Sequence, residues 1–231
     1  MTTNSSLWLT LAMTAALAGC SSLANINVVD SHASKVAARV VVRPEGFPKT
    51  TRSQGGLEFG YEHYRGANEQ TLEADSASAK LNGKELPAPD HFHNRVRINQ
   101  VYGGYNHVFN FRRFQLEPRA GLAYQQVDFR VSSSNPAIGS INVRRSGLYG
   151  DVGVTPRFNF SDVLAAEARV SAAVGPNRRS LDGELALVFR PVPALSLRAG
   201  YFWRDQQLLD ANASDLSLRI SGPTASVVMN F

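Results

Sequence analysis

From residue 54 to the end of the chain, apolar and polar residues alternate with a period of two, in segments separated by turn-forming residues. A period of two is that of a β-strand with one apolar and one polar face, and no useful length of chain follows the 3.6-residue period of a helix. The pattern predicts an all-β chain with about eight strands, at residues 54–65, 94–108, 114–130, 142–158, 163–174, 181–190, 195–206 and 215–231.

Two segments do not fit this pattern clearly. In residues 94–108, Val96 and Ile98 fit the apolar face, but Gly103-Gly104 interrupts the phase, and a β-bulge is the expected cause. Residues 36–43 (VAARVVVR) also alternate. They form either a ninth strand or a segment tucked against the others, and the sequence does not decide between these two.

The polar face of the predicted strands carries charges of both signs at mid-strand positions, beginning with Glu58 and Glu62 on the first strand. A soluble barrel turns its apolar face inward around a ligand, whereas a membrane barrel turns that face toward lipid and its charges inward. In the second case we expect an inward network of five carboxylates and five guanidiniums that closes the interior to solutes. Its predicted members are Glu117, Arg119, Asp151, Arg157, Glu167, Arg169, Asp182, Glu184, Arg190 and Arg198.

Composition favours the membrane arrangement. The 231 residues are 19% charged, and mean hydropathy is −0.19, too low for membrane-spanning helices beyond the N-terminus. The chain has 20 Arg and only 4 Lys, all four before residue 85, which suits charges paired in a confined space better than a free surface. The arginines are dispersed and form no basic run, so the net charge of +5 does not indicate nucleic-acid binding.

The connections between strands, and the aromatic residues, also differ between the two ends of the predicted barrel. Connections after the second, fourth and sixth strands are short, and those on the other side are generally longer, which is the outer-membrane pattern with both termini on the short-turn side. Aromatic residues are expected in two girdles, as at two membrane interfaces. The lower girdle is Phe114, Phe158, Phe189 and Phe231, and the upper is Tyr61, Tyr64, Tyr124, Tyr201 and Trp203.

The N-terminus reads as a processed leader. Residues 7–19 are an apolar stretch too short to span a membrane, and they end in Leu17-Ala18-Gly19-Cys20, which resembles a bacterial lipobox. The resemblance implies a signal peptide over residues 1–19, fatty acylation (palmitate-type) of Cys20, and a lipid-anchored linker over 20–52, with Ser21 implying the outer membrane. Residues 1–6 lack the usual Lys or Arg. An ordinary cleavable signal is the alternative.

The last residues carry a second resemblance. Val227, Met229 and Phe231 alternate at the C-terminus as in the signal by which the assembly machinery of bacterial outer-membrane barrels recognises its substrates. Together with the alternation, residues 53–231 resemble the small families typified by the OmpA transmembrane domain, OmpX and OmpW. The resemblance implies an antiparallel, up-and-down transmembrane β-barrel in the outer membrane, with outer-membrane lipid, lipopolysaccharide and the assembly machinery as partners.

No catalytic or cofactor motif is present, and no cofactor or metal is expected. His63 and His107 form no recognisable pairing with serine and acid, and His91 and His93 beside Asp90 read as loop polarity. We therefore expect a role in envelope structure or in contacts through residues 66–93, in which Asn82-Gly83 indicates a hairpin and disorder is the alternative. Two other functions stay open: a lipid-anchored soluble barrel of lipocalin type binding a small apolar ligand, and a lipid A-modifying barrel enzyme. The oligomeric state is not indicated.

Overall fold

The computed structural model describes residues 28–45, 47, 50, 52–72, 79–81, 84–86, 90–137, 139–208 and 216–231. Strands and their connections account for all of these residues, so the all-β prediction is confirmed. Among the same residues, no helix has the length and apolar character needed to cross a membrane.

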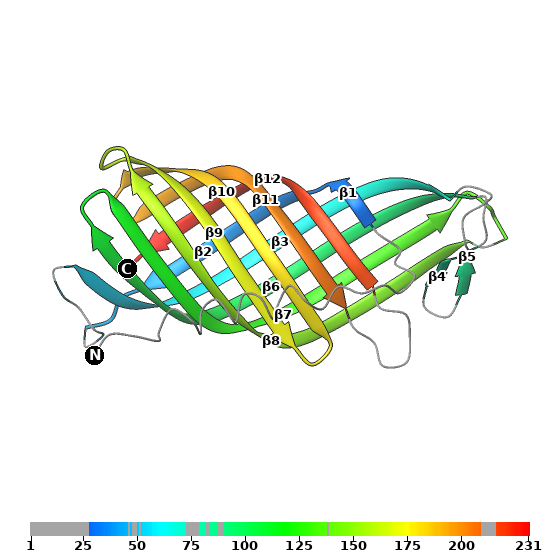
Figure 1. The fold of residues 1–231 in the computed structure, drawn as a ribbon, viewed down its shortest axis with the longest axis horizontal. Helices are drawn as coiled ribbons and strands as arrows, with labels where there is room; N and C mark the ends of the chain where they lie inside the picture. The colour runs from blue at the N-terminus through cyan, green and yellow to red at the C-terminus, as the bar shows by residue number, and fades with distance from the viewer. Residues whose placement is uncertain are drawn as a thin grey trace, which may run out of the picture.

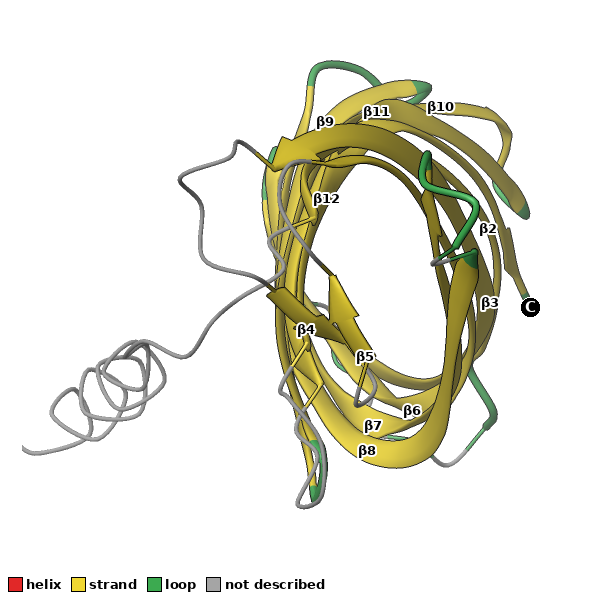
Figure 2. Cartoon of the chain, turned by 90° about the vertical axis from the view of Figure 1, so that its right-hand side faces the viewer, coloured by secondary structure: helices red, strands yellow, loops and turns green. Residues whose placement is uncertain are grey.

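Nine strands hydrogen-bond edge to edge and close into a ring (Figure 1, Figure 2). The eight predicted segments are all strands, most of them longer than the alternation indicated. Residues 34–42 supply the ninth, which settles the open question about 36–43. In chain order the ring consists of β2 (Ser34–Val42), β3 (Ser53–Leu72), β6 (Asp90–Phe111), β7 (Phe114–Ser133), β8 (Ser140–Asn159), β9 (Leu164–Gly175), β10 (Arg178–Val192), β11 (Leu195–Leu208) and β12 (Leu216–Asn230).

The ring closes through a parallel seam. Strand β2 pairs with β12 from Lys35 opposite Thr224 to Val41 opposite Asn230, and every other neighbouring pair in the ring is antiparallel. Strand β1 (Val28–His32) runs along β12 just before β2, so that together they form one nearly continuous border. An odd number of strands forces this parallel contact, because the first and last strands must then run in the same direction.

The seam corrects the prediction for the chain ends. The C-terminus lies at the end of the ring that carries the short turns 112–113, 160–163 and 193–194, as expected. Because β1 and β2 run parallel to β12, the described chain enters the ring at the opposite, long-connection end. The prediction of both termini on the short-turn side is therefore wrong for the start of β1. It assumed an even number of strands.

The long-connection end carries two further features. Strands β6, β7 and β8 extend farther toward it than β10 to β12 do (Figure 1). Two short strands, β4 (Ala79–Leu81) and β5 (Lys84–Leu86), pair there with Leu81 opposite Lys84, as the Asn-Gly motif predicts for a hairpin.

The outward face of the ring carries a broad apolar band. Leu122, Val152 and Leu185 are each 57–59% exposed in the isolated chain. The inward neighbours on the same strands are buried and polar, as with Glu117 on β7 and Asp151 on β8. The side chains that a soluble protein would bury are outside here, and the charges are inside.

Toward the long-connection end this arrangement reverses. There the interior is a packed apolar core that includes Phe92, Val96, Ile98, Phe129 and Val143. On β6 and β8 the outward neighbours of these core residues are polar, as with Arg95, Arg97 and Arg144. The register between β6 and β7 is continuous through Gly103 and Gly104, so the predicted bulge is wrong. Val96 and Ile98 share the inward face with polar Gln100, and what changes along β6 is the polarity of that face rather than its phase.

Both aromatic girdles face outward, with one exception. Phe114, Phe158, Phe189 and Phe231 are exposed at the short-turn end, and Tyr61, Tyr124, Tyr201 and Trp203 are exposed above them. Tyr64 does not belong to the upper girdle, because its ring is buried inside and packs edge-on against Phe202, with 5.3 Å between the ring centroids.

Candidate functional site: the charged interior

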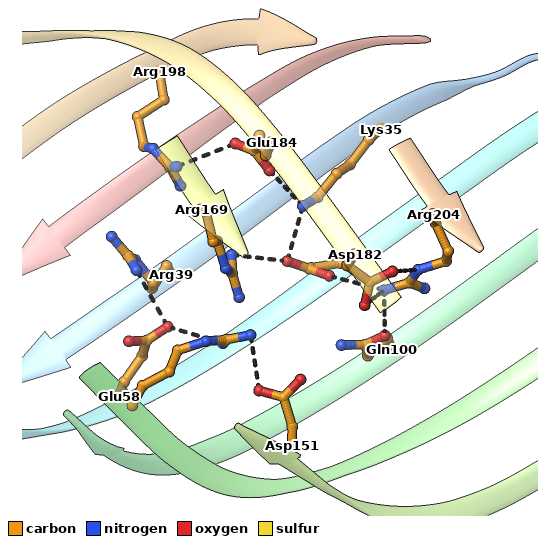
Figure 3. A network of polar contacts seen from close by, with 12 residues as sticks. Lys35, Arg39, Glu58, Gln100, Asp151, Arg169, Asp182, Glu184, Arg198 and Arg204 are labelled. Atoms are coloured by element: carbon orange, nitrogen blue, oxygen red, sulfur yellow. Dashed lines mark hydrogen bonds and ion pairs between the residues drawn. The ribbon is translucent and has the colours of Figure 1, made fainter. Parts of the chain in front are cut away.

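Glu62 on β3 is the centre of the interior network. Its carboxylate lies 3.1 Å from the Lys35 ammonium, 3.2 Å from the Arg169 guanidinium and 3.8 Å from that of Arg204, and it accepts a 2.6 Å hydrogen bond from the Tyr64 hydroxyl. The side chain is buried. These donors come from β2, β3, β9 and β11, so a single carboxylate ties together strands from different parts of the ring. Figure 3 shows part of this network, with Lys35, Arg169 and Arg204 labelled.

The network continues from Lys35 and Arg204. Lys35 also bonds Glu184 at 2.7 Å, and Glu184 lies 3.1 Å from Arg198. Arg198 in turn pairs with Glu167, which also pairs with Arg157 at 2.6 Å. On the other side, Arg204 pairs with Asp182 through two guanidinium nitrogens. This first cluster therefore holds five cations and four carboxylates.

A second cluster lies beside the first. Arg119 bonds Asp151 at 2.8 Å and lies 3.7 Å from Glu58. Arg39 lies 3.3 Å from Glu58 and 3.9 Å from Glu117. This cluster holds two cations and three carboxylates.

Tyr102 lies between the two clusters. Its ring is within 5.3 Å of the Arg119 guanidinium and 5.7 Å of the Arg169 guanidinium, distances at which cation–π attraction operates. Gly60 is directly opposite Tyr102, and a Cβ there would come within 2.3 Å of the tyrosine ring. The tyrosine side chain can therefore lie here only because residue 60 has no side chain.

The two clusters balance each other in charge. The first carries one excess positive charge and the second one excess negative charge, so the seven cations and seven carboxylates are neutral together. Buried charges are costly unless each is paired and hydrogen-bonded, and neutrality over so many groups is what that cost requires.

The structure brings nine of the ten residues predicted for this network into ion pairs. Arg190 is the exception: it is half-buried near the short turns and donates to the Asn159 side chain. Glu58 and Glu62, which the alternation also places on the polar face, join the network as well. Lys35, Arg39 and Arg204 are members that the prediction did not include. Lys35 and Arg39 were missed because the sequence did not decide whether their segment is a strand. In a strand, Lys35, Ala37, Arg39 and Val41 share one face.

A layer of amides closes the network toward the apolar core. Gln206 donates to Gln125 at 3.2 Å, Gln125 donates to Gln100 at 3.3 Å, and Arg204 also donates to Gln100. The cavity beside Lys35 and Glu62 encloses about 10 Å³, the space of roughly one water molecule. Little open space is thus left beside Glu62.

The other candidate residues lie elsewhere. Cys20 and the residues up to 27 are outside the described part of the chain. Val227, Met229 and Phe231 face outward at the short-turn end. The positions of these three apolar side chains do not indicate any catalytic chemistry.

The candidate histidines are spread over the outer surface and the rim. His63 contacts Asn99 at 2.7 Å, and His107 contacts the Tyr105 hydroxyl at 2.8 Å. His91 contacts Thr71 at 2.8 Å, and His93 lies 3.4 Å from Glu69.

No family model, curated protein or solved structure that was compared with this chain matches it.

Proposed function

We propose that this chain is an integral outer-membrane β-barrel protein with a plugged polar interior, acting in envelope structure or surface contacts rather than in catalysis. One observation carries the proposal: a ring of strands with an apolar outer band around a charged, ion-paired interior. In water this arrangement exposes apolar side chains and desolvates charges, two costs at once. In a lipid bilayer the outer band meets hydrocarbon instead.

The aromatic residues on both sides of the apolar band support the same proposal. The apolar band lies between outward phenylalanines at one end and outward tyrosines and a tryptophan at the other, which is the distribution that two lipid–water interfaces favour. A closed ring also leaves no unpaired strand edge at the level where β2 meets β12, and hydrocarbon tolerates no such edge. The soluble lipocalin-type alternative would need an apolar cavity at mid-height, where this interior is filled by ion pairs.

A charge scan of the outer band tests the proposal. Leu122→Arg and Val152→Arg each put a cation in the middle of the band, and we expect each to cost about 2–4 kcal/mol and sharply reduce assembly. The matched control is Gln126→Arg, which lies four residues above Leu122 on the same face of β7, outside the band. Gln125 is not a suitable control, because it is fully buried in the interior.

Two measurements read out the scan. The folded wild-type protein should run at a heat-modifiable position in gels and stay with the membrane during carbonate extraction. If Leu122→Arg and Gln126→Arg assemble equally well, and the wild type is released by carbonate, the outer band does not face lipid and the proposal is wrong.

Lipidation of Cys20 is a separate part of the proposal and is supported by the Leu17–Cys20 sequence alone. We expect Cys20→Ser to abolish incorporation of labelled palmitate and to change the processing of the leader. Mature protein of unchanged mass with undiminished label would contradict it. The barrel part would stand in either case.

A further inference from the structure

A basic strip lies on the outer face of the tall wall formed by β3, β6, β7 and β8. Neighbouring strands place Arg65, Arg97, Asp128 and Arg144 directly opposite one another in a single row. The row above it places Arg95 directly opposite Arg130. All five arginines of these two rows are exposed.

The strip is poorly compensated. Its carboxylate, Asp128, lies 3.1 Å from Arg144 and also accepts a hydrogen bond from Gln126. Among the described residues, Arg65, Arg95 and Arg97 contact no carboxylate. Like charges directly opposite in a sheet repel each other, and here this occurs twice, at Arg65–Arg97 and at Arg95–Arg130.

The opposite wall of the ring does not repeat this arrangement. There Arg219 stands directly opposite Asp205 and pairs with it at 3.1 Å. The repulsion in the tall wall is therefore a local feature, and an anion bound between the arginines would relieve it.

The rows beneath the strip indicate what kind of anion fits. Immediately below is a row of neutral polar side chains, His63, Asn99, Gln126 and Ser146, directly opposite one another. Such groups hydrogen-bond hydroxyls without requiring charge.

Below the neutral row comes the top of the apolar band. It consists of a row of Tyr61, Val101, Tyr124 and Leu148, all exposed. Read from the band outward, the wall therefore presents apolar, then neutral polar, then cationic groups, each as a row across four strands.

From this order we propose that the tall wall binds a phosphorylated glycolipid of the outer leaflet. Its acyl chains lie on the apolar band, its sugar hydroxyls meet the neutral row, and its phosphates are held by Arg65, Arg97, Arg95 and Arg130. Guanidiniums bind phosphate through paired, charge-assisted hydrogen bonds. The inference rests on the proposed function, because it needs the apolar band to lie in a bilayer.

The test compares lipid binding by two double variants and one control, using the full chain in detergent. Arg65→Gln/Arg97→Gln and Arg95→Gln/Arg130→Gln each remove a repelling pair, and Arg219→Gln is the matched exposed arginine on the other wall. The probes are diphosphoryl lipid A, the same lipid with its phosphates removed, and inorganic phosphate. Native mass spectrometry measures occupancy, and thermal unfolding measures stability.

We expect wild type and Arg219→Gln to bind diphosphoryl lipid A equally, and each double variant to bind it at least roughly tenfold more weakly. Removal of the lipid phosphates should weaken wild-type binding by a similar factor. Without lipid, the double variants should unfold at the same or a higher temperature than wild type, because a repulsion has gone. With lipid, they should lose the stabilisation that wild type gains.

Equal binding of diphosphoryl and phosphate-free lipid by wild type, or unchanged binding by both double variants, would overturn the inference. Equally tight binding of inorganic phosphate would overturn it too, because the site would then recognise the anion and not the lipid. These results are distinct from failure of the proposed function, which carbonate extraction and the Leu122→Arg scan report without any added lipid.

Discussion

At the scale of single residues, the interior is organised by carboxylates that each hold several cations. Glu62 is the clearest case, with three cations and the Tyr64 hydroxyl around one buried side chain. Removing one partner of a buried pair is far more costly than removing an exposed pair, because the remaining charge stays desolvated.

Glu62→Gln should therefore destabilise the protein by about 3–5 kcal/mol. Lys35→Met should do so as well, by leaving Glu62 and Glu184 short of a cation. The double variant Lys35→Met/Glu62→Gln restores neutrality, so its cost should be less than the sum of the two single costs. The measurement is the free energy of unfolding in detergent. The control is Asp205→Asn at the exposed pair with Arg219, which should cost about 0–1 kcal/mol. If the cost of the double variant equals the sum of the two single costs, Lys35 and Glu62 do not belong to a coupled network.

For most of the charged residues in the network, sequence alone identified that they face inward but not which of them meet. Alternation gives the face of each residue, because successive side chains in a strand point to opposite sides. It gives no information across the ring. Arg169 illustrates this: Glu184 is its direct neighbour on the next strand, yet its 3.2 Å ion pair is with Glu62 on the far side of the interior.

At the scale of strands, the alternation located all eight antiparallel segments, because each has enough residues for its pattern to show. It failed at two places for identifiable reasons. Strand β2 is only nine residues long, and it gains its role from pairing with β12, which is distant in the sequence. Strand β6 looked interrupted because its inward face changes from apolar to polar at Gln100, and period-two reasoning assumes that one face keeps one polarity.

The parallel seam makes a prediction at this scale. Ala38 lies directly opposite Val227, and both face outward. In a Cys20→Ser background, Ala38→Cys/Val227→Cys should cross-link under mild oxidation of the folded protein, as seen by a gel-mobility shift reversed by reductant. The control pair Ala38→Cys/Leu197→Cys is separated by the whole of β12 and should not cross-link. Equal cross-linking of both pairs would contradict the register of the seam.

At the scale of the whole molecule, the ring has distinct levels: apolar outside and charged inside over the proposed membrane zone, then polar outside and apolar inside beyond it. The reversal is written along single strands such as β6, but reasoning that gives each face one polarity throughout cannot recognise it. The amide layer of Gln100, Gln125 and Gln206 lies at the boundary between the two interiors.

A filled interior should conduct poorly. In planar bilayers we expect the purified protein to give little or no steady conductance, because ion pairs cross the interior at the level of Glu62, where the cavity is only about 10 Å³. A porin of known conductance, inserted under the same conditions, controls for membrane quality. Large, stable open channels would contradict a plugged interior.

The border strand β2 has one more consequence. Without it, β3 and β12 run in opposite directions and could close an ordinary eight-stranded antiparallel ring. That competing closure would lose Lys35 and Arg39, leaving five cations against seven carboxylates in the two clusters. The two uncompensated negative charges would penalise it. Charge as well as geometry therefore favours the nine-stranded ring, in which β2 supplies cations for four carboxylates of the two clusters.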